Sequence, residues 1–163
     1  MSPSRDETSA LDPAWPTHLT VQQVRIARPT DRLEEVVAFY VDGLGLARLG
    51  GFEGHAGYDG VFVGLPGTPY HLEFTRHVDG SPGDVPSAEH LLVLYLGSPA
   101  EVEAAATRLR EFGHEPVEAE NPYWAGIGAV TIPDPDGWRV VLAPVLDSAH
   151  RDLEQRRARS GHP

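Results

Sequence analysis

The chain repeats one succession of predicted elements twice. In each copy an alternating strand precedes a capped amphipathic helix that ends at a glycine, and glycine-punctuated strands follow; the copies run over residues 21–77 and 89–145. A copy of this size cannot bury a core of its own. We therefore expect an α+β fold in which two such units join around a shared concave sheet. Small molecules usually bind in such concave surfaces.

The helix of the second copy has the clearest boundaries. Ser98 is a good N-cap, Pro99 suits the first helical position, and Glu101 can complete a capping box with Ser98. Gly113 predicts a left-handed end to this helix. The apolar positions recur at helical spacing and predict one core-facing stripe, formed by Val102, Ala105, Ala106, Leu109 and Phe112.

The helix of the first copy follows the same rules. Thr30 or Asp31 is expected to cap it, and Gly43 is expected to end it. Its apolar stripe consists of Leu33, Val36, Val37 and Tyr40. We interpret both stripes as core rather than as cofactor-binding motifs.

Strands are predicted where apolar and polar residues alternate. On the first strand, Val24 and Ile26 are expected to pack under the helix, while Gln23, Arg25 and Ala27 face the concave side. The predicted ranges are 21–27, 61–64, 70–75, 89–96, 129–132 and 138–143, with weaker patterns at 47–52 and 114–119.

The chain divides into a central domain and two terminal segments. We predict one domain over residues 20–146, made of modules 20–78 and 88–146 and a Gly-, Pro- and Ser-containing linker at 79–87. Residues 1–19 are rich in Ser, Pro and acidic groups and are predicted to be a mobile arm. Residues 147–163 carry little apolar content and are predicted to be a frayed tail.

Composition argues against several classes of function. The formal net charge of -11 opposes binding to nucleic acid and to anionic membranes. The chain has no cysteine, so any metal must be held by His, Asp, Glu or Gln side chains. No apolar run approaches the ~20 residues of a membrane helix, and the N-terminus lacks a signal-peptide core. We expect a cytoplasmic protein that binds a small molecule.

Four motifs follow one another along the chain: AFYVDGLGL at 38–46, HLEF at 71–74, EHLLVLYL at 89–96 and IPDPDGWRVVL at 132–142. In this order and spacing the chain resembles the vicinal oxygen chelate superfamily, which comprises glyoxalases, bleomycin-resistance proteins and extradiol dioxygenases. The resemblance implies an α+β fold in which two βαβββ modules pair, within one chain or across a dimer, into a cupped, eight-stranded mixed sheet with the helices outside. It also implies a divalent metal held by one ligand from each of four strands.

The metal positions of that superfamily fall on Gln23, Glu73, His90 and Val141. Valine has no lone pair, so the resemblance implies either a weakly bound divalent metal, such as zinc, nickel, manganese or iron, on the first three residues, or a cup without metal. In a metal-free cup Glu73 would pair with His90 or with Arg25, because a buried carboxylate requires a partner.

Aromatic residues extend the candidate site. Tyr123 and Trp124 are predicted in a loop, and Phe52 and Tyr58 in the glycine-rich hairpin of the first copy. At the edges of a cup these rings would stack on a planar or polycyclic ligand. The alternative is that Tyr123 and Trp124 pack as ordinary core residues between the modules.

Two classes of function remain open. The first is a binding protein of the bleomycin-resistance kind, which would hold a small molecule, such as an aromatic one, in the cup with Arg25 and Glu73 setting the polarity. The second is a metal-dependent lyase, isomerase or dioxygenase, in which the metal polarises substrate oxygens and Glu73 or His71 moves a proton. His71 lies two residues before Glu73 and so shares its face of the strand. If the internal repeat also governs assembly, the protein is a homodimer.

Overall fold

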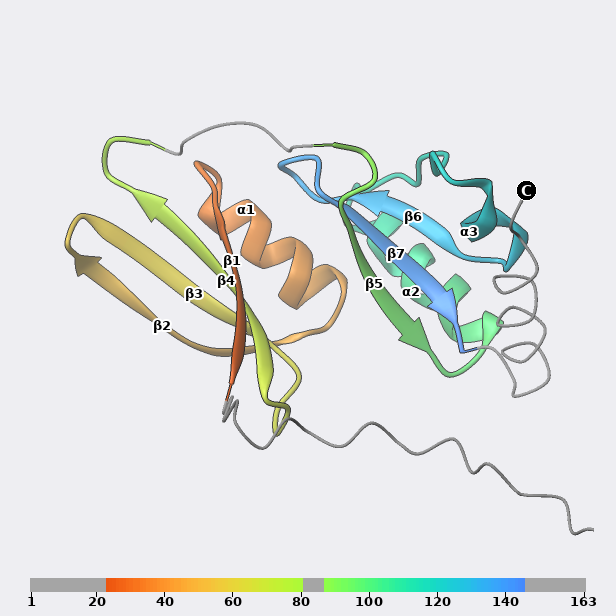
Figure 1. Ribbon diagram of the computed structural model, residues 1–163, viewed down its shortest axis with the longest axis horizontal. Helices are drawn as coiled ribbons and strands as arrows, with labels where there is room; N and C mark the ends of the chain where they lie inside the picture. Colours follow the sequence, from red (N-terminus) through yellow and green to blue (C-terminus); the bar gives the residue numbers. More distant parts are fainter. Residues whose placement is uncertain (1–22, 81–86, 146–163) are drawn as a thin grey trace, which may run out of the picture.

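The computed structural model describes residues 23–80 and 87–145 of the 163, and it divides them into two modules (Figure 1). The terminal segments 1–19 and 147–163, and most of the linker at 79–87, lie outside the described residues. Within the two described ranges, no helix is long and apolar enough to cross a membrane.

The first module is a βαβββ unit. It consists of β1 (Val24–Pro29), α1 (Leu33–Ala38), the π-helical turn η1 (Phe39–Gly43), β2 (Ala47–His55), β3 (Tyr58–Gly64) and β4 (Tyr70–His77). The sheet order is β1-β4-β3-β2, with β1 parallel to β4 and the other pairs antiparallel. The helical segment covers one face of this sheet, where Tyr40 stacks on Phe74 with ring centroids 4.8 Å apart.

The expectation that Val24 and Ile26 pack under the helix is wrong. Each side chain is 48% exposed. The reason is that β1 is an edge strand of the described sheet, whereas α1 packs over β3 and β4. The edge strand therefore keeps apolar side chains at the surface on the helix side.

The start of the first helix differs from the prediction, whereas its predicted end at Gly43 is confirmed. Arg32, not Thr30 or Asp31, is the N-cap, and the Thr30 hydroxyl accepts a hydrogen bond from the Arg32 amide at 2.9 Å. The helical segment does end at Gly43, but this residue is not left-handed. A β-carbon on Gly43 would lie 2.8 Å from the Leu109 side chain of the other module, so this glycine permits a close approach of two helices.

The second module contains β5 (Leu91–Leu96), α2 (Pro99–Glu111), α3 (Pro122–Gly126), β6 (Val130–Pro133) and β7 (Arg139–Pro144). Its sheet order is β5-β7-β6, with β5 parallel to β7 and β6 antiparallel to it. The strand expected at 114–119 is reduced to a single bridge between Val117 and Thr131. Pro116 lies in this segment and has no amide to donate to a strand ladder.

The boundaries predicted for α2 are confirmed. The Ser98 hydroxyl accepts a hydrogen bond from the Glu101 amide at 3.3 Å, Pro99 begins the helix, and Gly113 follows it at φ 87. The apolar stripe is narrower than predicted, because Phe112 is 51% exposed.

The two modules join through their helices. Side chains of both modules form one buried core, to which η1 and α2 contribute Phe39, Tyr40, Val102, Ala106 and Leu109. The guanidinium of Arg108 on α2 also donates two hydrogen bonds, of 3.0 and 2.9 Å, to the Asp42 carbonyl of η1. The described strands form two separate sheets of four and three strands, so residues 23–80 and 87–145 do not show the eight-stranded sheet expected from the sequence.

A buried polar bridge also links the modules. Arg28 of β1 donates to the Tyr40 hydroxyl at 2.5 Å and to Asp134, in the turn between β6 and β7, at 3.2 Å. The Tyr40 hydroxyl donates to the same carboxylate at 2.9 Å. Burial raises the pKa of Tyr40, so its hydroxyl keeps its proton. The Arg28 guanidinium lies over the rings of Phe74 and Trp138, at 4.9 and 4.6 Å from their centroids.

Candidate functional site

The candidate site lies on the face of the first sheet that is turned away from α1, which we call the open face. Because side chains alternate along a strand, Leu72 and Phe74 of β4 point into the core under the helix, and His71 and Glu73 point to the open face. In the parallel register, Arg25 of β1 is paired with His71. The first and fourth strands thus place one guanidinium beside an imidazole and a carboxylate.

Arg25 is held by both of these neighbours. Its Nε donates to Nε2 of His71 at 3.0 Å, and its Nη1 lies 2.8 Å from Oε2 of Glu73. Since Nε2 of His71 accepts this hydrogen bond, that nitrogen is unprotonated. His71 and Glu73 are 5% and 6% exposed, whereas the Arg25 side chain is 45% exposed. The two buried side chains therefore hold the guanidinium in one orientation, while its other side is open to solvent.

Aromatic rings surround this guanidinium. Phe62 of β3 lies 4.6 Å from the Arg25 guanidinium carbon and 5.5 Å from the His71 ring. Phe52 of β2 follows at 5.9 Å from Phe62. A side chain at Gly60 would overlap the Phe52 ring, so this glycine makes room for Phe52 on the open face. Phe62 is not among the residues predicted from the sequence, although its alternation with the core residues Val61 and Val63 indicates that it lies on the open face.

Two further candidates of the first module, Tyr58 and Gln23, lie outside this cluster. Tyr58 begins β3 and packs on His77, with ring centroids 4.4 Å apart. Gln23 is exposed just before β1. The structure thus brings Arg25, Phe52, His71 and Glu73 together and leaves Tyr58 and Gln23 at the periphery.

The candidates of the second module are not part of this cluster. His90 is exposed before β5, lies 2.8 Å from the Ser87 hydroxyl, and has its ring 6.4 Å from Trp138. Tyr123 and Trp124 belong to the short helix α3 rather than to a loop, and their rings contact each other at 5.1 Å. Among the described residues, these side chains have no contact with the cluster around Arg25.

The donor set of this chain does not fit a divalent metal. Glu73 and His71 are both engaged by the Arg25 guanidinium, which places a fixed positive charge between them. The fourth position, Val141, is a fully buried apolar residue of β7. Across residues 23–80 and 87–145, no three His, Asp or Glu side chains form a group that could hold a metal. Of the two pairings expected for a metal-free cup, the one between Glu73 and Arg25 is confirmed.

Comparison with known proteins identifies the fold. The chain is similar to glyoxalase I of Leishmania major, with a TM-score of 0.64 over 83% of this chain and 97% of that structure; at 17% identity this likeness concerns the fold alone. It is also similar to an antibiotic-binding protein from Streptomyces, with 26% identity and a TM-score of 0.57 over 78% of this chain and 98% of that one. The protein therefore has the glyoxalase and bleomycin-resistance fold.

The family is more specific than the fold. The model of the YycE-like N-terminal domain matches residues 24–75, and that of the YycE-like C-terminal domain matches residues 89–144. The uncharacterized protein YycE of Bacillus subtilis is 52% identical over 120 residues, which cover 74% of this chain and 86% of that protein. A crystal structure of a YycE protein of unknown function from the same species has 49% identity and a TM-score of 0.73, covering 78% of this chain and 92% of that one. The chain belongs to the YycE-like family.

Proposed function

We propose that this protein binds a planar small molecule that carries a negatively charged or strongly polarised oxygen, on the open face of its first sheet. The observation that carries the proposal is the orientation of Arg25. Two of its three nitrogens are used by His71 and Glu73, and the structure gives Nη2 no partner among the described residues. A guanidinium that is already fixed loses little side-chain entropy when it donates to a ligand.

The surrounding rings support a flat ligand. Phe52 and Phe62 line the same face as Arg25, and both are partly exposed. Aromatic side chains offer stacking surfaces to planar ligands, while a single charged donor fixes the orientation of the ligand. The related antibiotic-binding protein from Streptomyces, which shares 26% of its sequence with this chain, favours a binding function of this kind.

In this proposal His71 and Glu73 position Arg25 rather than transfer protons. Both side chains are buried under the guanidinium and bonded to it. The enzymatic alternative depended on a metal at Glu73, and the fixed guanidinium of Arg25 beside this carboxylate would repel a cation there.

A second copy of the chain is proposed to complete the cup. β1 and β5 are edge strands of their sheets within the described residues. Val24, Ile26 and Tyr70 are each 48% exposed at the β1 edge. Apolar groups exposed together mark an interaction surface. In a homodimer, the second sheet of the partner copy would face the open face, and Tyr123 and Trp124 of the partner would then be able to reach the ligand.

The test uses two fluorescent probes of the same shape, 2-naphthoate and 2-naphthalenemethanol. The folded protein is expected to bind the carboxylate more tightly than the alcohol. Arg25→Gln should weaken 2-naphthoate binding by about tenfold or more, since a hydrogen bond to a charged group contributes ~1.5–3 kcal/mol. The same variant should leave 2-naphthalenemethanol almost unaffected, whereas Phe52→Ala should weaken both probes.

Two controls accompany these titrations. Arg110→Gln removes a positive charge from the surface of α2 and should change neither affinity. Arg25→Lys keeps the charge but replaces the planar fork of the guanidinium by a single flexible ammonium group, which is less well oriented by His71 and Glu73, so an intermediate affinity is expected. Equal losses for both probes in Arg25→Gln would contradict the assigned role of the guanidinium.

The assembly is tested separately by light scattering after gel filtration. The unmodified protein should be a dimer, and Ile26→Glu should shift it to the monomer and weaken 2-naphthoate binding. A monomer that binds the probe with unchanged affinity would refute the two-chain cup and leave the open face as the complete site.

A further inference from the structure

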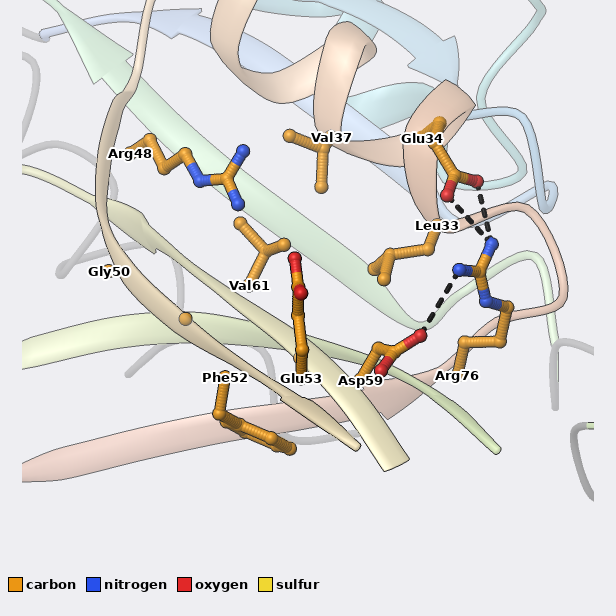
Figure 2. Close-up of a pocket in the computed structure, with 12 residues that line it drawn as sticks. Leu33, Glu34, Val37, Arg48, Gly50, Phe52, Glu53, Asp59, Val61 and Arg76 are labelled. Carbon is orange, nitrogen blue, oxygen red and sulfur yellow. Dashed lines mark hydrogen bonds and ion pairs between the residues drawn. The ribbon is translucent and has the colours of Figure 1, made fainter. Parts of the chain in front are cut away.

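The first module has a second concave surface, on the side of the sheet opposite to the open face. A cavity of about 700 Å³ lies between α1 and the strands β2 and β3 (Figure 2). Its apolar floor is formed by Leu33, Val37 and Val61, while charged side chains lie around it. This volume is within the range of sites that hold small organic ligands.

A β-bulge explains why two charged residues meet here. Arg48 and Glu53 are five positions apart on β2, and a regular strand would place them on opposite faces. The register of β2 shifts between Arg48 and Gly50, so that Arg48 is paired with Val63 while residue 51 is paired with Val61. Both charged side chains consequently point into the cavity, as Figure 2 shows.

A glycine keeps the wall between these two residues free of side chains. Gly51 belongs to the same stretch of β2, and a β-carbon there would lie 2.5 Å from the carbonyl oxygen of Gly60 on β3. No larger residue fits without moving the backbone. Because residue 51 has no side chain, the space above the apolar floor stays open between Arg48 and Glu53.

The charges at one end of the cavity are already paired. Arg76 donates to both carboxylate oxygens of Glu34, at 2.7 and 2.8 Å, and lies 3.2 Å from Asp59. The backbone amide of Gly54 also donates to Asp59 at 2.9 Å. This network closes that end of the cavity: its one guanidinium is bonded to both carboxylates, so it has no free cation for a ligand, and the three groups together carry a net charge of −1.

Arg48 and Glu53 are in a different situation. Neither side chain has a hydrogen-bond or ion-pair partner among the described residues, and both are accessible from solvent. The cavity thus presents one unpaired guanidinium and one unpaired carboxylate beside an apolar floor. A simple anion would be attracted by Arg48 and repelled by Glu53, so a ligand that carries both charges matches the site better.

We infer that this cavity binds a zwitterionic amphiphile of the size of a short peptide. The carboxylate of the ligand is bonded by Arg48, its ammonium group by Glu53, and its apolar side chains lie on Leu33, Val37 and Val61. This second site is separated from the proposed open-face site by the thickness of the sheet, and it does not depend on that proposal.

The experiment compares three peptides by isothermal titration calorimetry with the full-length protein. Leucyl-leucine carries both charges, N-acetyl-leucyl-leucine lacks the ammonium group, and leucyl-leucine amide lacks the carboxylate. We expect leucyl-leucine to bind about tenfold more tightly than either blocked peptide, as expected when a charge-assisted hydrogen bond is lost.

Substitutions of the two exposed residues then show which charge of the ligand each residue binds. Arg48→Gln should make leucyl-leucine and its amide bind equally well, while the preference over the acetylated peptide persists. Glu53→Gln should make leucyl-leucine and N-acetyl-leucyl-leucine bind equally well, while the preference over the amide persists. Arg110→Gln, which removes a distant surface charge, is the matched control and should preserve both preferences. Saturating 2-naphthoate should not displace leucyl-leucine, which separates this site from the open face.

Three results would overturn the inference. These are the absence of measurable binding of any of the three peptides, equal affinities for all three, or a loss in Arg48→Gln that is the same for the peptide and its amide.

Discussion

Replacing Arg28 by methionine would remove the cation of the buried bridge between the two modules. Asp134, which is 4% exposed, would keep the Tyr40 hydroxyl and two backbone amides as donors but would lose its charged partner. Methionine retains most of the packing against the aromatic rings of Phe74 and Trp138. Removing one partner of a buried ion pair costs about 3–5 kcal/mol of unfolding free energy. For a chain of this size the melting temperature should fall by roughly 6–20 °C.

The loss of unfolding free energy in Arg28→Met should depend on pH. Burial raises the pKa of the Asp134 carboxyl, while Arg28, Tyr40 and the amides of Trp138 and Asp136 act in the opposite direction. A carboxyl with a raised pKa in the folded state contributes stability below its unfolded pKa, and this contribution is lost as the pH rises through the folded pKa. Without Arg28 that pKa rises further. The difference between variant and unmodified protein should therefore be small in acid and grow toward neutral pH.

Urea denaturation followed by tryptophan fluorescence, repeated between about pH 4 and pH 8, measures this difference. The double variant Arg28→Met with Asp134→Asn is the control: it has no carboxyl group at residue 134, so its loss of unfolding free energy relative to the unmodified protein should not grow toward neutral pH. A loss in Arg28→Met that is the same at every pH, or that is below about 1 kcal/mol, would refute the reasoning.

Three further experiments test separate features. Ser98→Ala should lower the unfolding free energy by about 1 kcal/mol through loss of the helix cap, measured by urea denaturation; an unchanged midpoint would argue against the cap. Gly51→Ala should destabilise more than Gly67→Ala, because a β-carbon at residue 51 meets backbone, whereas at Gly67 nothing lies within 4 Å and only the φ of 79 is unfavourable. After dialysis, elemental analysis should find less than one equivalent of divalent metal per chain; stoichiometric metal that Glu73→Ala removes would contradict the assignment of a metal-free site.

Local rules predicted the parts of the molecule that depend on neighbouring residues. The cap at Ser98 and the glycine at 113 set the ends of α2, and both were readable because they act within one helical turn. The strict alternation of β1 and β4 likewise placed Arg25, His71 and Glu73 on one face. The contact between Arg25 and Glu73 had been one of two alternatives, because alternation gives the face of a residue but not its partner.

Features that depend on distant residues could not be predicted in this way. An apolar stripe shows that a helix packs, but not what it packs against, so the sequence did not indicate that η1 and α2 would pack together and separate the sheets. The bridge from Arg28 to Asp134 spans more than a hundred positions and has no local signal. The bulge after Arg48 breaks the period of two on which all face assignments rest, and so the second cavity was not foreseen.

The common core of the modules has a consequence for how the chain can be divided. A fragment ending at residue 80 would leave the apolar stripe of its helix in water, and so would a fragment beginning at residue 87. The repeat that is visible in the sequence is thus not an autonomous folding unit. Two such fragments, produced separately, would need each other to fold, and this makes the chain a suitable scaffold for a split-protein reporter whose signal appears only when both pieces meet.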